Sequence, residues 1–152
     1  MSSKFLILTQ NLKLFFMPAS ILIIDDYDDN RELLRVMLEQ AGYVVSEARG
    51  GREGIEMARA SPPDVALVDL SMPGLDGWEV LDQLRADERT RGILCAAISA
   101  YADGARALAL AHGFDAYLTK PFRRNELLET VERLLREPLV QKQETSAREE
   151  VS

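Results

Sequence analysis

The stretch VALVDLSMPGLDGWEV (residues 65–80) joins a short apolar run, a carboxylate, a turn and the start of a helix. The four apolar residues 65–68 predict a strand buried on both faces, as is typical of parallel sheets. Asp69 ends that strand. Asp76 is a good helix N-cap, with Glu79 three residues later as in a capping box, so a helix is predicted over residues 77–87. The stretch therefore predicts a buried strand that carries a carboxylate at its carboxyl end.

The same alternation of apolar run and helical period recurs on both sides of this stretch. The first helix is predicted from the spacing of Leu33, Leu34, Met37 and Leu38, and the helix that ends at His112 is predicted to be capped by Asp103. The remaining elements are strands at residues 21–24, 43–48, 93–98 and 116–119, and helices at residues 51–60 and 127–135. Five strands alternating with five helices indicate a mostly parallel sheet with helices on both faces.

Composition limits the class of protein. The chain has 152 residues, of which 47% are hydrophobic and 28% charged, which fits one ordinary globular domain. Its net charge of −7 argues against binding to nucleic acid, because an acidic surface repels phosphate backbones. The chain contains one cysteine and one histidine, which excludes a disulfide framework and metal sites rich in these residues.

The two ends of the chain are predicted to lie outside the domain. Polar residues interrupt the apolar N-terminal extension, residues 1–19, too early for a membrane span or a signal peptide, and translation from Met17 is an open alternative. Residues 137–152 are polar and charged and are predicted to form a disordered tail. The predicted domain therefore covers residues 20–136, with no membrane association.

Chemically active side chains follow the predicted strands. Asp25 and Asp26 follow the first strand, Asp69 the third, Ser99 the fourth and Lys120 the fifth. Since the carboxyl ends of parallel strands lie at one edge of the sheet, these side chains are expected to converge there. Each one alone has a simpler explanation as a helix cap, a turn residue or a surface charge, but together they predict a site.

The predicted cluster fits phosphoryl transfer. Three carboxylates repel one another unless a cation lies among them, and oxygen ligands of this kind suit Mg²⁺. A magnesium ion, a lysine and a hydroxyl group can hold phosphoryl oxygens, while one carboxylate can act as the nucleophile and form an aspartyl phosphate. A carboxylate is already ionised at neutral pH and needs no general base.

These residues and their spacing resemble the receiver domains of two-component response regulators, from about Ser20 to Arg136. The stretches that carry the resemblance are residues 21–26, 65–80, 98–100 and 117–122, which read ILIIDD, VALVDLSMPGLDGWEV, ISA and YLTKPF. The resemblance implies a flavodoxin-like, doubly wound (βα)5 fold, with a five-stranded parallel sheet in the order 2-1-3-4-5. It also implies a signalling switch that catalyses only its own phosphorylation and dephosphorylation.

The resemblance assigns the acidic residues. Asp69 would accept the phosphoryl group, and Mg²⁺ would be held by Asp25, Asp26, Asp69 and the main-chain carbonyl of Ser71. No other cofactor is implied.

The resemblance also assigns the switch residues. Ser99 would move toward the phosphoryl group, Tyr117 would reorient with it, and Lys120 would pair with the phosphoryl oxygens. The bond between Lys120 and Pro121 would be cis. Tyr117 could equally be a packed strand aromatic, which the sequence alone does not reject.

The resemblance implies protein partners in the cytoplasm. A sensor histidine kinase or phosphotransfer protein would dock near the first helix and the Asp69 edge. A downstream target, or a second copy in a phosphorylation-dependent homodimer, would use the face around the fourth helix, fifth strand and fifth helix. Because only 16 residues follow residue 136, a stand-alone receiver without an output domain is expected.

Two alternatives remain open from the sequence. Asp26 and Asp28 after the first strand also resemble the paired aspartates of haloacid-dehalogenase-type phosphatases, with Asp26 as nucleophile. That reading leaves the Met-Pro-Gly and Lys-Pro-Phe stretches unexplained. The other alternative is a receiver-shaped interaction module that is never phosphorylated.

Overall fold

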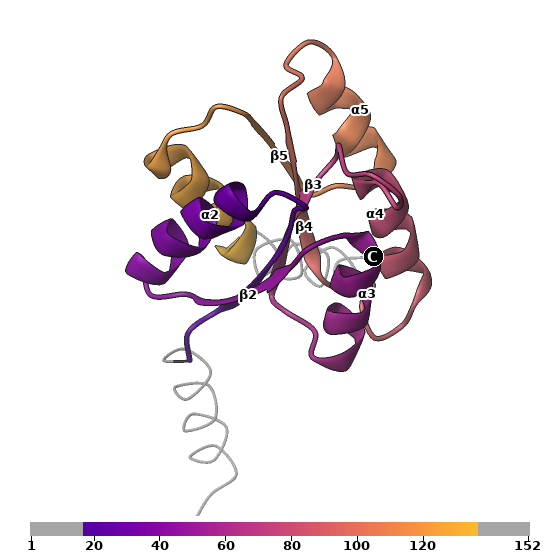
Figure 1. Cartoon of the computed structure of the whole chain (residues 1–152), viewed down its shortest axis with the longest axis horizontal. Coiled ribbons are helices and arrows are strands. Elements are labelled where there is room, and N and C mark those ends of the chain that lie inside the picture. The colour runs from indigo at the N-terminus through magenta and orange to yellow at the C-terminus, as the bar shows by residue number, and fades with distance from the viewer. Residues whose placement is uncertain (1–16, 137–152) are drawn as a thin grey trace, which may run out of the picture.

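A five-stranded parallel sheet forms the centre of the molecule (Figure 1). The structure is a computed structural model and describes residues 17–136. The strand order is β2-β1-β3-β4-β5, as predicted, and every neighbouring pair is parallel. The strands are β1 (Ser20–Ile24), β2 (Val44–Ala48), β3 (Val65–Asp69), β4 (Leu94–Ser99) and β5 (Ala116–Thr119).

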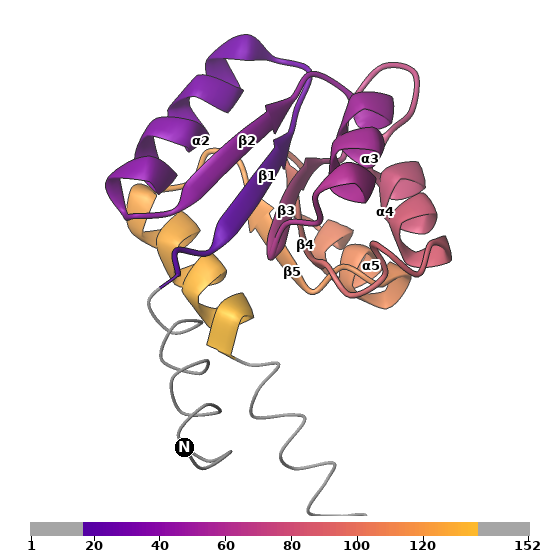
Figure 2. The ribbon, with the colours of Figure 1, turned by 90° about the horizontal axis from the view of Figure 1, so that it is seen from below.

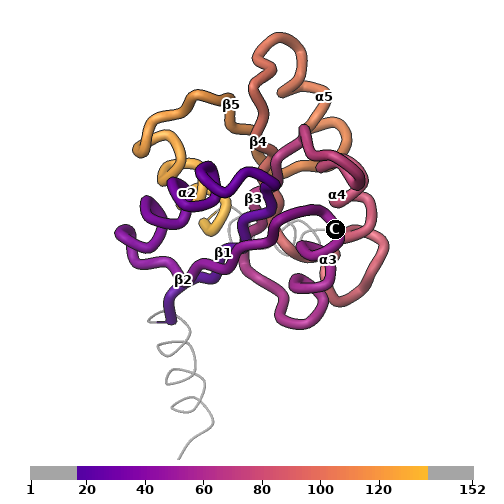
Figure 3. The backbone as a smooth tube through the Cα atoms, viewed as in Figure 1, coloured from indigo at the N-terminus to yellow at the C-terminus, as the bar shows by residue number. Residues whose placement is uncertain are grey.

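Helices cover both faces of the sheet. One face carries α2 and the helix at residues 124–136, and the other carries α3, α4 and α5 (Figures 1 and 2). Figure 3 follows the backbone through the successive crossovers between strands. The helices that join the strands are α2 (Asp28–Gln40), α3 (Gly51–Ala60), α4 (Gly77–Ala86) and α5 (Ala105–His112). The doubly wound α/β fold is therefore confirmed.

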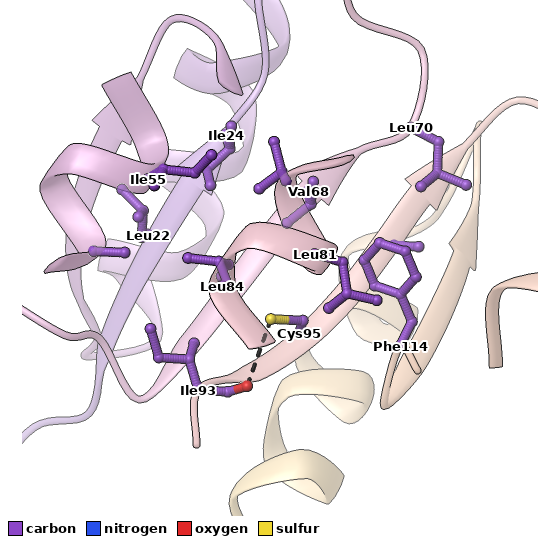
Figure 4. Close-up of a cluster of buried hydrophobic side chains, with 14 of the residues drawn as sticks. Leu22, Ile24, Ile55, Val68, Leu70, Leu81, Leu84, Ile93, Cys95 and Phe114 are labelled. Carbon is purple, nitrogen blue, oxygen red and sulfur yellow. Dashed lines mark hydrogen bonds between the residues drawn. The ribbon is translucent and has the colours of Figure 1, made fainter. Parts of the chain in front are cut away.

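Alternation along the strands builds two hydrophobic cores. In β1, Ile21 and Ile23 face the core under α2, while Leu22 and Ile24 face the core under α3 and α4. All four side chains are at most 1% exposed, and burial of each contributes about 1.5–3 kcal/mol. Figure 4 shows part of the core under α3 and α4, with Phe114 and Leu70 toward one end. A sheet buried on both faces leaves its strand ends as the places where polar side chains can gather.

Two helical predictions are wrong in detail. Asp103 does not cap α5, because Gly104 adopts a left-handed conformation (φ 72°) and the helix begins only after this turn, at Ala105. Leu33 does not join the buried face of α2: it is 52% exposed, and the buried residues are Arg31, Leu34 and Leu38. The spacing of three and four residues between these buried positions is the helical period.

The predicted ends of the chain are mostly not described. Of the N-terminal extension only Met17–Ala19 lies within the described residues, and the predicted tail lies wholly outside them. Within residues 17–136, no helix has both the length and the apolar character needed to span a membrane.

Candidate functional site

Three carboxylates meet at the carboxyl edge of the sheet. Asp25 directly follows β1, and Asp69 ends β3; the preceding residues, Ile24 and Val68, are paired between these neighbouring strands. Asp26 follows Asp25, and one carboxylate oxygen from each of the three aspartates lies within 4.8 Å of the other two. Asp25 and Asp69 are buried, whereas Asp26 is exposed. The structure thus brings together the three predicted metal-binding carboxylates.

Lys120 enters this cluster from the end of β5. Its Nζ lies 3.0 Å from Asp69 Oδ2 and 3.7 Å from Asp25 Oδ2. Its backbone N–H donates to the carbonyl of Ser99, 2.8 Å away, and the peptide bond to Pro121 is cis, as the resemblance implied. One ammonium group therefore lies within 4 Å of two of the three clustered carboxylates.

The pKa of the Asp25 carboxyl group is raised above its ordinary value. Burial raises the pKa of its carboxyl group, the N–H of Tyr27 lowers it, and the nearby charge of Asp69 raises it. Asp25 Oδ1 accepts a hydrogen bond from Tyr27 N at 2.8 Å, but the buried Oδ2 accepts none. A buried carboxylate oxygen without a donor, beside two further carboxylates, fits a hard divalent cation such as Mg²⁺, which prefers oxygen ligands.

The turn after β3 holds Asp69 in place. Ser71 N donates to Asp69 Oδ1 at 2.8 Å, while Lys120 binds the other oxygen. Gly77 allows α4 to begin against this turn, because a Cβ there would lie only 2.4 Å from the carbonyl oxygen of Asp69. Asp76 caps α4, as predicted, by accepting a hydrogen bond from Glu79 N at 2.9 Å. Both oxygens of Asp69 therefore have fixed donors.

Ser99 and Tyr117 are joined through the backbone of Tyr101. Ser99 is 1% exposed, and its Oγ accepts a hydrogen bond from Tyr101 N at 3.1 Å. The phenol of Tyr117 donates to the carbonyl of the same Tyr101. The Tyr117 side chain is buried in the hydrophobic core on the α3, α4 and α5 face of the sheet, whereas Tyr101 is 69% exposed. Ser99 and Tyr117 are therefore both hydrogen-bonded to main-chain atoms of one residue.

Sequence reasoning missed one residue beside the site. Arg31, in the first turn of α2, is 6% exposed, and one of its guanidinium nitrogens donates to the main-chain carbonyl of Asp25 at 2.8 Å. The signal was present, because Arg31 stands three residues before Leu34 and seven before Leu38, on the buried face of the helix. An arginine at such a position needs partners, and Asp25 supplies one of them.

The sequence of the site matches a known family. Residues 21–132 match the family model described as the response regulator receiver domain. The chain belongs to this family. This receiver is 33% identical over 120 residues to the polar-differentiation response regulator DivK of Brucella anthropi, covering 78% of this chain and 98% of the relative. It is therefore a phosphorylation-controlled signalling switch of a two-component system, whose partners are histidine kinases or phosphotransfer proteins and downstream targets.

Solved structures agree with the fold of this receiver. The chemotaxis protein CheY4 of Vibrio cholerae superimposes with a TM-score of 0.73 at 28% identity, covering 78% of this chain and 99% of CheY4. The receiver domain of the sensor histidine kinase PA1611 of Pseudomonas aeruginosa superimposes with a TM-score of 0.71 at 32% identity, covering 78% and 98% of the two chains. That structure has a magnesium ion coordinated in its active-site cleft.

Proposed function

We propose that Asp69 is the residue that accepts the phosphoryl group. Its carboxylate is 8% exposed and accepts a hydrogen bond from Ser71 N. It also lies 3.0 Å from Nζ of Lys120, the only lysine within residues 17–136. An oxygen of Asp69 forms the new bond to phosphorus while the bond from phosphorus to the donor breaks. Lys120 then stabilises the negative charge on the phosphoryl oxygens. The single observation that supports this role most strongly is the contact between Asp69 and Lys120.

The proposed metal is Mg²⁺, held by Asp25, Asp26, Asp69 and the main-chain carbonyl of Ser71. When bound, the ion neutralises charge on the phosphoryl group as transfer proceeds. The donor-free Oδ2 of Asp25 and the close approach of the three carboxylates support this choice.

Ser99 and Tyr117 form the proposed switch. As Ser99 moves its hydroxyl toward the phosphoryl group, the bond between Ser99 Oγ and Tyr101 N changes, and the carbonyl of Tyr101 carries that change to Tyr117. Tyr101 and, on the following helix α5, Leu108 and Leu110 are exposed apolar side chains. We place the target-binding surface there, and a phosphorylation-dependent homodimer is the alternative occupant.

A groove beside Lys120 is the proposed docking surface for the phosphodonor protein. It has a volume of about 380 Å³ and lies between α2 and the loop after β5. Its lining is mostly apolar and includes Leu33, Ala100, Pro121 and Phe122. Since Lys120 lines both the groove and the carboxylate cluster, a partner seated here would bring its phosphohistidine to Asp69. Because histidine kinases take the phosphoryl group from ATP, we propose that this reaction takes place in the cytoplasm.

Asp69 is tested by phosphorylation with acetyl phosphate and Mg²⁺, followed by intact mass. The wild type is expected to gain one base-labile phosphoryl group, and Asp69→Asn none. Asp76→Asn is the matched control, because asparagine also caps helices and should leave both α4 and labelling intact. Persistent labelling of Asp69→Asn would contradict the assignment of Asp69 as the phosphoacceptor. Absence of any label on the wild type would favour an interaction module that is never phosphorylated.

The groove is tested with a phosphotransfer protein that phosphorylates the wild type. Leu33→Glu is expected to slow transfer from that protein but not from acetyl phosphate, because the side chain lines the groove and is exposed. Val36→Glu, an exposed position on the same helix outside the groove, should slow transfer less. Equal effects of both variants would argue against docking in the groove.

A further inference from the structure

A buried guanidinium group supports the turn that carries two of the three clustered carboxylates. The side chain of Arg31 is only 7% exposed. It reaches across the first turn of α2 to the main-chain carbonyl of Asp25, which one of its nitrogens approaches to 2.8 Å. A second nitrogen binds the carboxylate of Asp28, and Nε lies 3.8 Å from Glu47 Oε1 on the neighbouring strand β2. Arg31 therefore links the turn after β1 to the adjacent strand.

The contact of Arg31 with Asp25 lies on the peptide group that joins Asp25 to Asp26. The carbonyl of Asp25 belongs to the peptide group that leads into Asp26, so fixing this carbonyl fixes the plane of that group. Asp25 also donates its own N–H to Ala48 O at 3.2 Å, and its carboxylate accepts from Tyr27 N and lies 3.7 Å from Lys120 Nζ. Asp26 is exposed, so its direction depends on the backbone that carries it.

We propose that Arg31 is a positioning residue for the magnesium site, acting through the peptide group between Asp25 and Asp26. This inference rests on the proposed function of the carboxylate cluster. It also separates two effects of opposite sign. Removing a positive charge near an acidic site strengthens attraction for a cation, whereas releasing the turn spoils the arrangement of the ligands and weakens binding. The sign of the change in affinity therefore distinguishes positioning from simple charge.

The test measures Mg²⁺ binding directly, by calorimetric titration of the full chain with MgCl₂. Arg31→Met is expected to bind Mg²⁺ about tenfold more weakly, the lower end of the effect of residues that orient metal ligands. Arg31→Lys keeps the charge but not the planar fork, and should fall between Arg31→Met and the wild type.

Arg35→Met is the matched control. Arg35 stands one turn further along α2 and lies 3.3 Å from the other oxygen of Glu47, so the substitution removes the same charge and a contact with the same carboxylate. It makes no hydrogen bond to Asp25 among those the structure describes. We expect its Mg²⁺ affinity to equal or slightly exceed that of the wild type.

Each outcome bears on one claim. If Arg31→Met binds Mg²⁺ as tightly as the wild type or more tightly, or if Arg31→Met and Arg35→Met weaken Mg²⁺ binding equally, the proposed role of Arg31 is wrong but the proposed site is not. A wild type that binds no Mg²⁺ would instead overturn the proposed site. Circular dichroism establishes that each variant is folded at the titration temperature. If Arg31→Met does not fold, Arg31→Lys decides the matter, because wild-type affinity in that variant contradicts the proposal.

Discussion

The two edges of the sheet treat their carboxylates in opposite ways. At the amino edge, Asp115 Oδ2 accepts from Arg85 Nη2 at 3.0 Å and from Cys95 N at 2.8 Å. Asp64 there accepts from Ser20 N at 2.8 Å and donates its own N–H to the serine hydroxyl. The carboxyl edge instead gathers three carboxylates, two of which lie near the ammonium group of Lys120, and leaves Asp25 Oδ2 without a hydrogen-bond donor.

The carboxylates at the amino edge are arranged to stabilise the fold, whereas those at the carboxyl edge are arranged for the proposed function. Paired carboxylates at the amino edge tie loops to strands, and removing them should cost stability. The crowded carboxylates at the carboxyl edge oppose folding through burial and repulsion, which the proposed cation would offset. The same chemical substitution should therefore have opposite effects at the two edges.

The largest expected effect is on the reaction at the carboxyl edge. Lys120→Met removes the ammonium group that lies 3.0 Å from Asp69, so labelling by acetyl phosphate should slow about a hundredfold. The rate is measured by intact mass against time. Asp115→Asn, at the opposite edge, should label at the wild-type rate. If Lys120→Met also labels at that rate, the proposed role of the lysine is wrong.

The next effect is a gain in stability from a neutral side chain at the carboxyl edge. Asp25→Asn keeps an acceptor for Tyr27 N but removes a buried charge, so without Mg²⁺ the free energy of unfolding should rise by about 1–2 kcal/mol. Urea denaturation measures it. With saturating Mg²⁺ the gain should shrink, because the ion stabilises the native wild type. A loss of stability in the absence of Mg²⁺ would contradict the comparison.

At the amino edge the same substitution should destabilise. Asp115→Asn removes the ion pair with Arg85, which is partly exposed, so the free energy of unfolding should fall by about 1 kcal/mol. Urea denaturation with and without Mg²⁺ should give the same loss, because this edge holds no proposed ligand. A loss that depends on Mg²⁺ would show that the two edges are coupled.

The smallest effect is a local one at Cys95. Burial raises the pKa of this thiol to about 12, so at pH 8 only about one molecule in 10⁴ carries the reactive thiolate. Alkylation by iodoacetamide at pH 8 should be very slow in the native protein and rapid in urea. Asp115→Asn should accelerate native alkylation, because loss of the ion pair with Arg85 weakens the edge at which Asp115 accepts a hydrogen bond from Cys95 N, while Asp25→Asn should not.

The sequence predicted the sheet and the cluster for the same physical reason. Four-residue apolar runs such as 65–68 become buried strands, and parallel strands bring their carboxyl ends to one edge, so Asp25, Asp69 and Lys120 could be placed together without coordinates. The observed ion pair between Asp69 and Lys120 agrees with that placement. The roles of the individual site residues remain predictions.

Other features depended on packing that a linear pattern does not contain. Asp103 has the chemistry of a cap, but α5 starts where the chain turns at Gly104. The apolar spacing of α2 does not include Arg31, because a charged residue does not contribute to that pattern even when it lies on the buried face of the helix. Only the structure shows that its partners come from the turn after β1 and from Glu47 on β2.

The backbone link through Tyr101 has a consequence for how such proteins diversify. Both hydrogen bonds that join Ser99 to Tyr117 use main-chain atoms of Tyr101, whose own side chain is 69% exposed. The side chain at this position can therefore be exchanged without removing either bond. Recognition of a new target could be engineered or selected there while both hydrogen bonds of the proposed switch are preserved.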